Sequence, residues 1–190
     1  MKNIILFGPP GAGKGTQSAK IIERYKLAHI ATGDLFRMHL KEGTPLGLLA
    51  KSYMVNGNLV PDQVVIDMVD EKIKGETDVQ GIIFDGFPRT TPQARALDAL
   101  LDSKGTPIKV LIELVVEEEE LKKRLAERAK KEDRPDDAKM EVIENRIAVY
   151  RKETMAVAEY YQKENKYVGI SGIGEIDEIF NHLCGVLDKV

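Results

Sequence analysis

The residues with the clearest chemical meaning lie close to the N-terminus, where a glycine-rich turn leads into Lys14 and Thr16. The turn spans Gly8–Thr16 and reads GPPGAGKGT. Glycines can adopt backbone angles that are closed to other residues, so successive N–H groups can point into one concavity. Lys14 would bring a positive charge to the outer phosphates of a nucleotide, and Thr16 could direct a hydroxyl toward Mg²⁺. We therefore predict a phosphate-binding loop.

The elements on either side of this turn support that prediction. The apolar run Lys2–Phe7 indicates a buried strand, and the composition from Lys14 to Tyr25 indicates a helix. The start of that helix would favour an anion through its unpaired N–H groups and its dipole. The general motif places Ser or Thr directly after the lysine, whereas here Gly15 intervenes. The alternative is an ordinary glycine-rich turn, which this order of strand, turn and helix disfavours.

The rest of the chain alternates short apolar runs with amphipathic stretches, which predicts an α/β fold. Helices are expected over 14–25, from 32 to near 43, over 45–54, after 62, after 91, over 117–129 and 141–163, and at the C-terminus. Strands are expected at 2–7, 27–31, 81–85, 108–116 and 167–170. About five strands that alternate with helices indicate a doubly wound parallel sheet flanked by helices.

Local signals add detail at three positions. Thr32 and Asp34 are expected to cap the helix that begins there, and Thr44 to cap the next one, which has Pro45 in its first turn. Asp85 ends the third predicted strand, at the edge of the sheet where ligands bind in such folds. Asp85 is therefore a candidate for ordering the water ligands of Mg²⁺.

Composition limits the class of protein. The 190 residues predict one substantial core, and the net charge of −3 argues against general nucleic-acid affinity. A single cysteine, Cys184, can form neither an internal disulfide nor a cysteine-rich zinc site. We expect no signal peptide, and the sequence has no apolar run of membrane-spanning length. We expect a cytoplasmic enzyme without membrane or nucleic-acid partners, and a monomer.

Three motifs in this order resemble those of the adenylate kinase family of nucleoside monophosphate kinases. They are the glycine-rich stretch 8–17, the segment TGDLFR at 32–37, and DGFPR at 85–89 with Gln93. The Lys14-Gly15-Thr16 spacing is usual in this family, and the resemblance covers essentially the whole chain. It implies a reversible reaction in which Mg·ATP and AMP give two ADP.

The resemblance also implies a role for each matching residue. The residues implied to bind ATP are Gly11, Ala12, Gly13, Lys14, Gly15, Thr16, Arg128 and Gly174. Those implied to bind AMP are Thr32, Arg37, Asn58, Leu59, Val60, Gly86, Phe87, Pro88, Arg89, Gln93, Arg134 and Arg146. The expected catalytic set is Lys14, Arg89, Arg128, Arg134 and Arg146, with Asp85 added as the Mg²⁺ candidate together with Thr16.

The domain organisation follows from the same resemblance. Residues 1–190 would form a single P-loop kinase domain with a core of 1–29, 61–126 and 138–190. A monophosphate-binding subdomain would span 30–60, and a short lid would span 127–137; both are expected to be mobile. Longer relatives carry an inserted lid, sometimes with cysteine ligands for zinc. Both are absent here, so Mg²⁺ with ATP is the expected cofactor and zinc is not.

The residue inventory suits phosphoryl transfer, which needs positioning and charge stabilisation more than covalent chemistry. An AMP phosphate is already mostly dianionic at neutral pH, so it needs no general base. His29, His39 and His182 show no ligand spacing and are expected to be structural. Tyr150, Tyr160 and Tyr161 are expected to pack, and Arg124 and Arg151 are set aside as ordinary exposed charges.

Three alternatives remain. A UMP or CMP kinase of the same fold is disfavoured by Thr32 and Gln93, because the pyrimidine enzymes typically have Ala and Asn at the matching positions. A P-loop hydrolase or GTPase is disfavoured because the sequence lacks an Asn-Lys-x-Asp motif and such an enzyme has no need for Arg37 and Arg89. A catalytically silent nucleotide-binding module would not need this full set of phosphate-facing residues.

Overall fold

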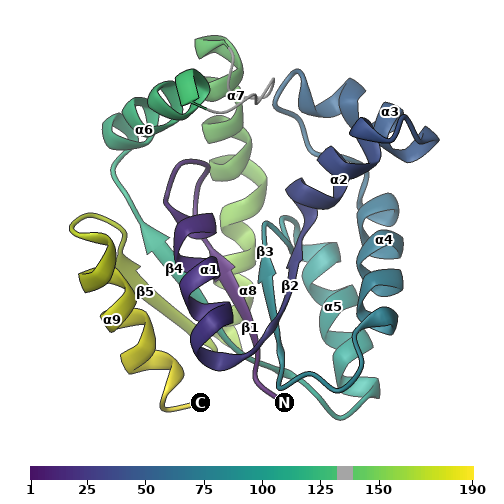
Figure 1. Ribbon diagram of the computed structural model, residues 1–190, viewed down its shortest axis with the longest axis vertical. Coiled ribbons are helices and arrows are strands. Elements are labelled where there is room, and N and C mark those ends of the chain that lie inside the picture. The colour runs from purple at the N-terminus through teal and green to yellow at the C-terminus, as the bar shows by residue number, and fades with distance from the viewer. Residues whose placement is uncertain (132–138) are drawn as a thin grey trace.

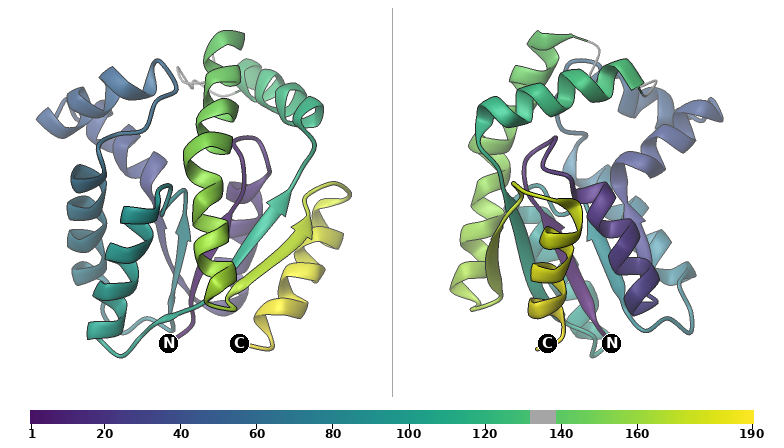
Figure 2. Two further views of the ribbon diagram at one scale, coloured as in Figure 1. Left: turned by 180° about the vertical axis from the view of Figure 1, so that it is seen from behind. Right: turned by 60° about the vertical axis from the view of Figure 1, so that its left-hand side comes forward.

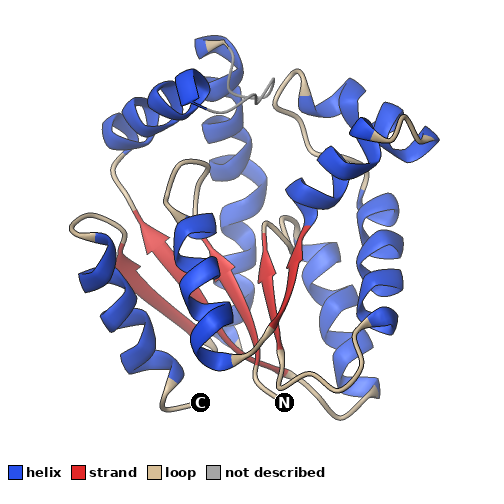
Figure 3. Ribbon diagram, in the orientation of Figure 1, coloured by secondary structure: helices blue, strands red, loops and turns tan. Residues whose placement is uncertain are grey.

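The computed structural model describes residues 1–131 and 139–190, which form a five-stranded parallel sheet between two layers of helices (Figure 1, Figure 3). The strands are β1 (Asn3–Phe7), β2 (Ala28–Ala31), β3 (Ile82–Asp85), β4 (Ile108–Val115) and β5 (Tyr167–Ser171). Their order is β2-β3-β1-β4-β5, and all neighbouring strands pair in parallel. The predicted fold class is confirmed.

Helices cover both faces of the sheet because β1 buries side chains on both sides. Ile4 and Leu6 face α1 (Lys14–Tyr25) and α9 (Ile176–Leu187), and these two helices also contact each other. Ile5 and Phe7 belong to the other cluster, with α4 (Asp62–Gly75), α5 (Thr91–Ser103) and α8 (Met155–Lys163) (Figure 2, left). All five residues of β1 are buried, as expected for a parallel strand covered on both faces.

The three helices predicted between the second and third strands are present. They are α2 (Thr32–Lys41), α3 (Pro45–Met54) and α4. The hydroxyl of Thr44 accepts the N–H of Gly47 at 3.1 Å, which confirms the predicted cap. The predicted cap on α2 is wrong, because no side chain caps this helix; the Thr32 hydroxyl instead donates to the carbonyl of Gly86 at 2.8 Å. Its position directly after β2 places it beside the loop that follows β3.

The long helix predicted over 141–163 is interrupted by a wider turn. It consists of α7 (Met140–Val149), the π-helical turn η2 (Tyr150–Thr154) and α8. The N–H of Met155 bonds to the carbonyl of Tyr150, five residues earlier instead of four. The apolar periodicity continues through this turn, so the sequence pattern alone did not reveal it.

The elements that carry the predicted site lie at one end of the molecule. Helix α6 (Glu118–Lys131), α7 and the pair α2 and α3 lie beyond the carboxyl ends of the strands, whereas both chain termini lie at the opposite end (Figure 1). Among the described residues, no helix combines the length and apolar character that a membrane crossing needs. Cys184 is buried within α9, as expected for a small apolar side chain.

Candidate functional site

A pocket of about 670 Å³ opens at the carboxyl edge of the sheet. Its walls come from segments far apart in the sequence: the glycine-rich loop, the end of β2 with α2, the turn after α3, the loop after β3, α6, and α7 with η2. The carboxyl ends of all five parallel strands meet at this edge, so the loops that follow them converge there. The size and location suit a small-molecule site.

The glycine-rich loop has the conformation that the sequence predicts. Gly8, Gly11 and Gly13 have φ values of 138°, 85° and 93°, which residues with a Cβ rarely adopt. Gly13 stands at the start of α1, and a Cβ on it or on Gly15 would meet no atom within 4 Å. The loop therefore leaves room for a bulky anion in front of the helix N-terminus.

Lys14 folds back over this loop. Its Nζ donates to the carbonyls of Gly8 at 2.8 Å and Pro9 at 3.0 Å. Burial lowers the pKa of Lys14 to about 8; Asp85 opposes this effect, and the charges of three arginines, Arg89, Arg146 and Arg128, add to it. The pocket thus concentrates positive charge around the lysine, which is an arrangement that a phosphate would stabilise.

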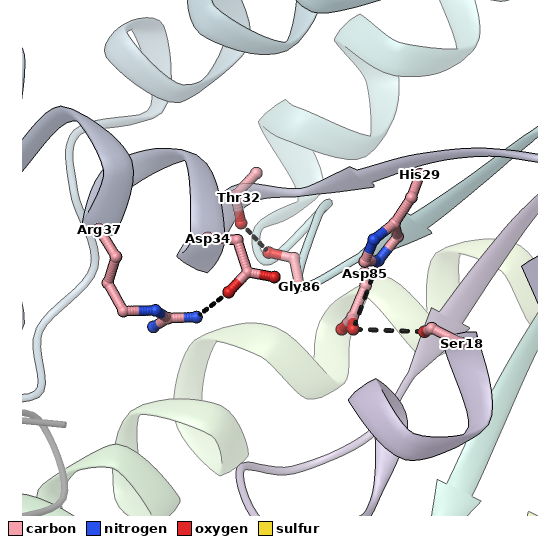
Figure 4. Close-up of polar contacts among 7 residues, drawn as sticks. All are labelled: Ser18, His29, Thr32, Asp34, Arg37, Asp85 and Gly86. Atoms are coloured by element: carbon pink, nitrogen blue, oxygen red, sulfur yellow. Dashed lines mark hydrogen bonds and ion pairs between the residues drawn. The ribbon is translucent and has the colours of Figure 1, made fainter. Parts of the chain in front are cut away.

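Asp85 provides the negative charge in this part of the pocket. The hydroxyl of Ser18 donates to its Oδ2 at 3.3 Å, and Nε2 of His29 lies 3.9 Å from the same oxygen (Figure 4). Burial alone would raise the pKa of Asp85, but the imidazole of His29 and the charge of Lys14 outweigh burial and hold the pKa below its usual value. The carboxylate therefore stays ionised.

The second group of predicted residues converges on the carbonyl of Gly86. Thr32 donates to it at 2.8 Å, and Nε of Arg89 donates to it at 2.7 Å. Gly86 has a φ of 73°, and a Cβ there would lie 3.0 Å from Nη2 of Arg89. Arg37 on α2 pairs with Asp34 at 2.6 Å, and both lie on the same side as Thr32 and Gly86 (Figure 4). An anion could compete with Asp34 for Arg37.

Gln93 lies behind this loop and is 2% exposed. Its Oε1 accepts the N–H of Arg89 at 2.8 Å, and its Nε2 donates to Asp62 at 2.8 Å. Thr90 donates to the same oxygen of Asp62 at 3.0 Å. Gln93 and Asp62 therefore brace the loop that carries Arg89. Asp62 was not predicted as a site residue, because its position in the first turn of α4 is also typical of an acid that only stabilises a helix N-terminus.

Most of the predicted site residues line the pocket. They are Gly11, Gly13, Lys14, Gly15, Thr16, Arg37, Asn58, Leu59, Asp85, Gly86, Phe87, Pro88, Arg89, Arg128 and Arg146. Four others are buried beside it and do not line it, namely Ala12, Thr32, Val60 and Gln93. Gly174 is exposed in the turn after β5 and is not part of the lining. Arg134 lies outside the described residues.

The structure adds residues that sequence reasoning set aside. His29, expected to be structural, lines the pocket beside Asp85. Arg124 also lines the pocket, and its Nη1 donates to the carbonyl of Gly172 at 3.0 Å. Arg124 lies four residues before Arg128, so both fall on one face of α6, and this spacing could have predicted that Arg124 reaches the same pocket. Tyr150 packs in the core as expected, with 8% exposure, yet it borders the pocket too.

The oxygen donors of the pocket suit a hard cation. Thr16 is exposed in the lining, and the ionised Asp85 lines the same cavity. Within the described part of the chain, no group of three or more His, Cys, Asp or Glu side chains is arranged to hold a metal ion by itself. A Mg²⁺ ion carried by phosphate oxygens needs few protein ligands, so the donor set is compatible with it.

Comparison with known proteins gives consistent matches. The model of the family described as adenylate kinase matches residues 6–166. The adenylate kinase of Parabacteroides distasonis is 47% identical over 190 residues, and that of Bacteroides fragilis 46% identical over 190 residues, each covering 100% of both chains. The adenylate kinase of Methanosarcina barkeri is 42% identical over an alignment that covers 98% of this chain and 99% of that protein.

Proposed function

We infer the activity from the family: the chain belongs to the adenylate kinase family, and it is an ATP:AMP phosphotransferase that converts ATP and AMP reversibly into two ADP. The structural observation that carries this function is a single pocket shared by Lys14 on the glycine-rich loop and by Arg37 and Arg89 on separate elements. A hydrolase needs to bind one nucleotide. Two groups of cationic side chains that face one cavity suit two bound nucleotides.

We propose that the ATP phosphates lie in the loop of residues 11–16 and that Arg37 and Arg89 hold the AMP phosphate. Arginine suits this task because its planar fork can bind two phosphate oxygens at once. Arg128 and Arg146 would stabilise the phosphoryl group in transfer. Their charges lower the pKa of Lys14, and this effect supports the placement because it requires both arginines to lie within electrostatic range of the loop.

The transfer step requires little covalent chemistry from the side chains of the protein. The AMP phosphate is mostly dianionic at neutral pH, so its oxygen attacks without a general base. The side chains hold the two phosphates in line and stabilise the charge that spreads over the transferring group. We propose that segments 30–60 and 127–137 close over the substrates, because exclusion of water prevents hydrolysis of ATP.

Mg²⁺ with ATP is the proposed cofactor, with Thr16 and Asp85 ordering its water ligands. When bound, the ion neutralises phosphate charge. The variant Asp85→Asn should therefore lower Mg²⁺-dependent turnover while AMP affinity changes little. A strong loss of AMP affinity with unchanged Mg²⁺ dependence would contradict this role. The monomeric state and the cytoplasmic location stay predictions.

An ADP-formation assay with AMP, UMP, CMP or GMP tests the proposed specificity, with ATP alone as the hydrolysis control. We expect turnover with AMP to exceed that with the other acceptors. The variants Arg37→Ala and Arg89→Ala should each raise the KM for AMP more than that for ATP. Arg151→Ala is a matched control, because Arg151 is exposed, pairs with Glu118 at 2.5 Å and does not line the main pocket. Equal effects on both KM values would contradict the assignment.

A further inference from the structure

The π-helical turn at Tyr150–Thr154 lies against the pocket and links it to the sheet. Arg146, Val149, Tyr150 and Thr154 all line the pocket, so the lining continues from α7 across this turn. A π turn is rare, and single π turns inside α-helices are frequent at functional sites. This one begins at Tyr150, one helical turn after the proposed phosphate ligand Arg146.

Tyr150 contacts the central strand of the sheet, β1, and its neighbour β4. Its hydroxyl donates to Oε1 of Glu113 on β4 at 2.7 Å. Its ring packs against Phe7 at the end of β1, with 5.6 Å between ring centroids. Phe7 and Glu113 are partners in the register of the two strands, and Phe7 directly precedes Gly8 of the phosphate-binding loop. Tyr150 therefore joins the helix that carries Arg146 to the strand that carries the loop of Lys14.

Tyr150 also borders a second hollow. This hollow, of about 150 Å³, is open to solvent and is also lined by Pro9, Glu113 and the exposed Met155. Tyr150 itself is buried in the core, so its ring packing and its hydrogen bond to Glu113 together hold this turn against the sheet.

A polar link from α7 reaches a part of the chain that we propose to move. Nδ2 of Asn145 donates to the carbonyl of Asn56 at 2.7 Å and to Oδ1 of Asn58 at 3.0 Å. Both acceptors lie within the proposed monophosphate-binding segment 30–60. The bond from Tyr150 ends on the sheet, so it can persist when that segment opens.

We propose that Tyr150 is a positioning residue for phosphoryl transfer, which acts through its bond to Glu113 by fixing α7 over the sheet and thereby placing Arg146 relative to Lys14. This inference rests on the proposed role of Arg146. Tyr150 need not touch a substrate. Its contribution is to hold a cationic side chain where charge develops in the transition state, so its loss should slow the transfer step more than it weakens binding.

The chain supplies a matched control. Tyr167 on β5 donates its hydroxyl to the other oxygen, Oε2, of the same Glu113 at 2.8 Å, but it does not line the pocket. Tyr150→Phe and Tyr167→Phe each remove one hydroxyl and leave one oxygen of Glu113 without that donor. Similar losses of thermal stability are therefore expected, and only Tyr150→Phe should affect catalysis.

The experiment is a single-turnover measurement of phosphoryl transfer, because lid opening or product release can mask the chemical step in steady state. We expect Tyr150→Phe to lower the transfer rate about tenfold with little change in the KM values. Tyr167→Phe should stay within about twofold of the unchanged protein. Equal rate losses in the two variants would overturn the proposal.

A double-mutant cycle separates this inference from the role of Arg146. In an Arg146→Ala background, Tyr150→Phe should cost less than about twofold, because the group that it positions is gone. If Tyr150→Phe lowered the transfer rate by the same factor with and without Arg146, the proposal would be overturned and the role of Arg146 would stay intact. If Arg146→Ala itself left the transfer rate unchanged, the role of Arg146 would be wrong, and this inference with it. If Tyr150→Phe did not fold, Glu113→Gln, which preserves side-chain size, would replace it. The rate effects of Glu113→Gln and Arg146→Ala should then be coupled in the same way. Independent effects of these two substitutions would refute the proposal.

Discussion

Binding of nucleotide phosphates should cause Lys14 to take up a proton. In the free protein, burial lowers the pKa of this lysine to about 8 from its ordinary value of 10.5. Phosphate oxygens in the loop would replace lost hydration with negative charge, so the pKa should return toward the ordinary value. The depressed pKa corresponds to a cost of about 3 kcal/mol for keeping the lysine charged in the empty pocket. Part of the phosphate binding energy removes this cost.

The proton uptake has a defined pH dependence. With a pKa of about 8 in the free protein and near 10.5 in the complex, uptake should be about 0.1 proton at pH 7, about 0.5 at pH 8 and about 0.9 at pH 9. The second pKa of a phosphate monoester lies near 6, so the ligand contributes little at pH 8 and above. The rise from pH 7 to pH 9 is therefore the signature of Lys14.

Isothermal titration calorimetry in buffers of different ionisation enthalpy measures this uptake. ATP is added with EDTA and without an acceptor, so that no transfer occurs. Lys14→Arg is the control, because a guanidinium keeps the charge but does not titrate in this range. Uptake that is flat between pH 7 and 9, or that persists in Lys14→Arg, would refute the reasoning.

The same pKa difference predicts a change in stability without ligand. Between pH 8 and 10.5 the unfolded state holds the Lys14 proton and the folded state does not, so the free energy of unfolding rises with pH in that window. Below pH 8 both states are protonated and the cost is fully present. Urea unfolding at pH 7.5 and 9.5 should show a larger rise for the unchanged protein than for Lys14→Arg, and an equal rise would count against the lowered pKa.

Further substitutions test the fold around the site. Asn3→Ala should lower stability by about 2–4 kcal/mol in urea unfolding with kcat unchanged, because this fully buried amide bonds a backbone carbonyl at 2.6 Å and a backbone N–H at 3.0 Å, far from the pocket. Gly57→Ala should lower kcat much more than Gly105→Ala. Both glycines have positive φ, but of the two only Gly57 would place a Cβ against Arg146, at 2.8 Å from its Cγ. Equal losses of kcat would show that backbone strain alone is responsible. Thr44→Ala should cost about 1 kcal/mol through loss of the α3 cap, and no change in melting temperature would exclude that contribution.

The sequence by itself determined those features of the protein that depend on residues close together along the chain. Helix α1 runs from Lys14 to Tyr25 as predicted, because the glycine-rich turn before it and the amphipathic pattern within it are local signals. The cap at Thr44 and the conformations of Gly11 and Gly13 were predictable for the same reason. The resemblance of three motifs to a known family also named most residues of the pocket lining.

Only the tertiary structure decided the relations between distant segments. The pairing of β2 with β3 brings His29 next to Asp85, and the pairing of β1 with β4 brings Phe7 next to Glu113. The hydroxyl of Thr32 bonds a carbonyl 54 residues away instead of capping its own helix. Each of these outcomes depends on which faces pack together. Local backbone preference does not encode that choice, because the competing partners become available only when the sheet has formed.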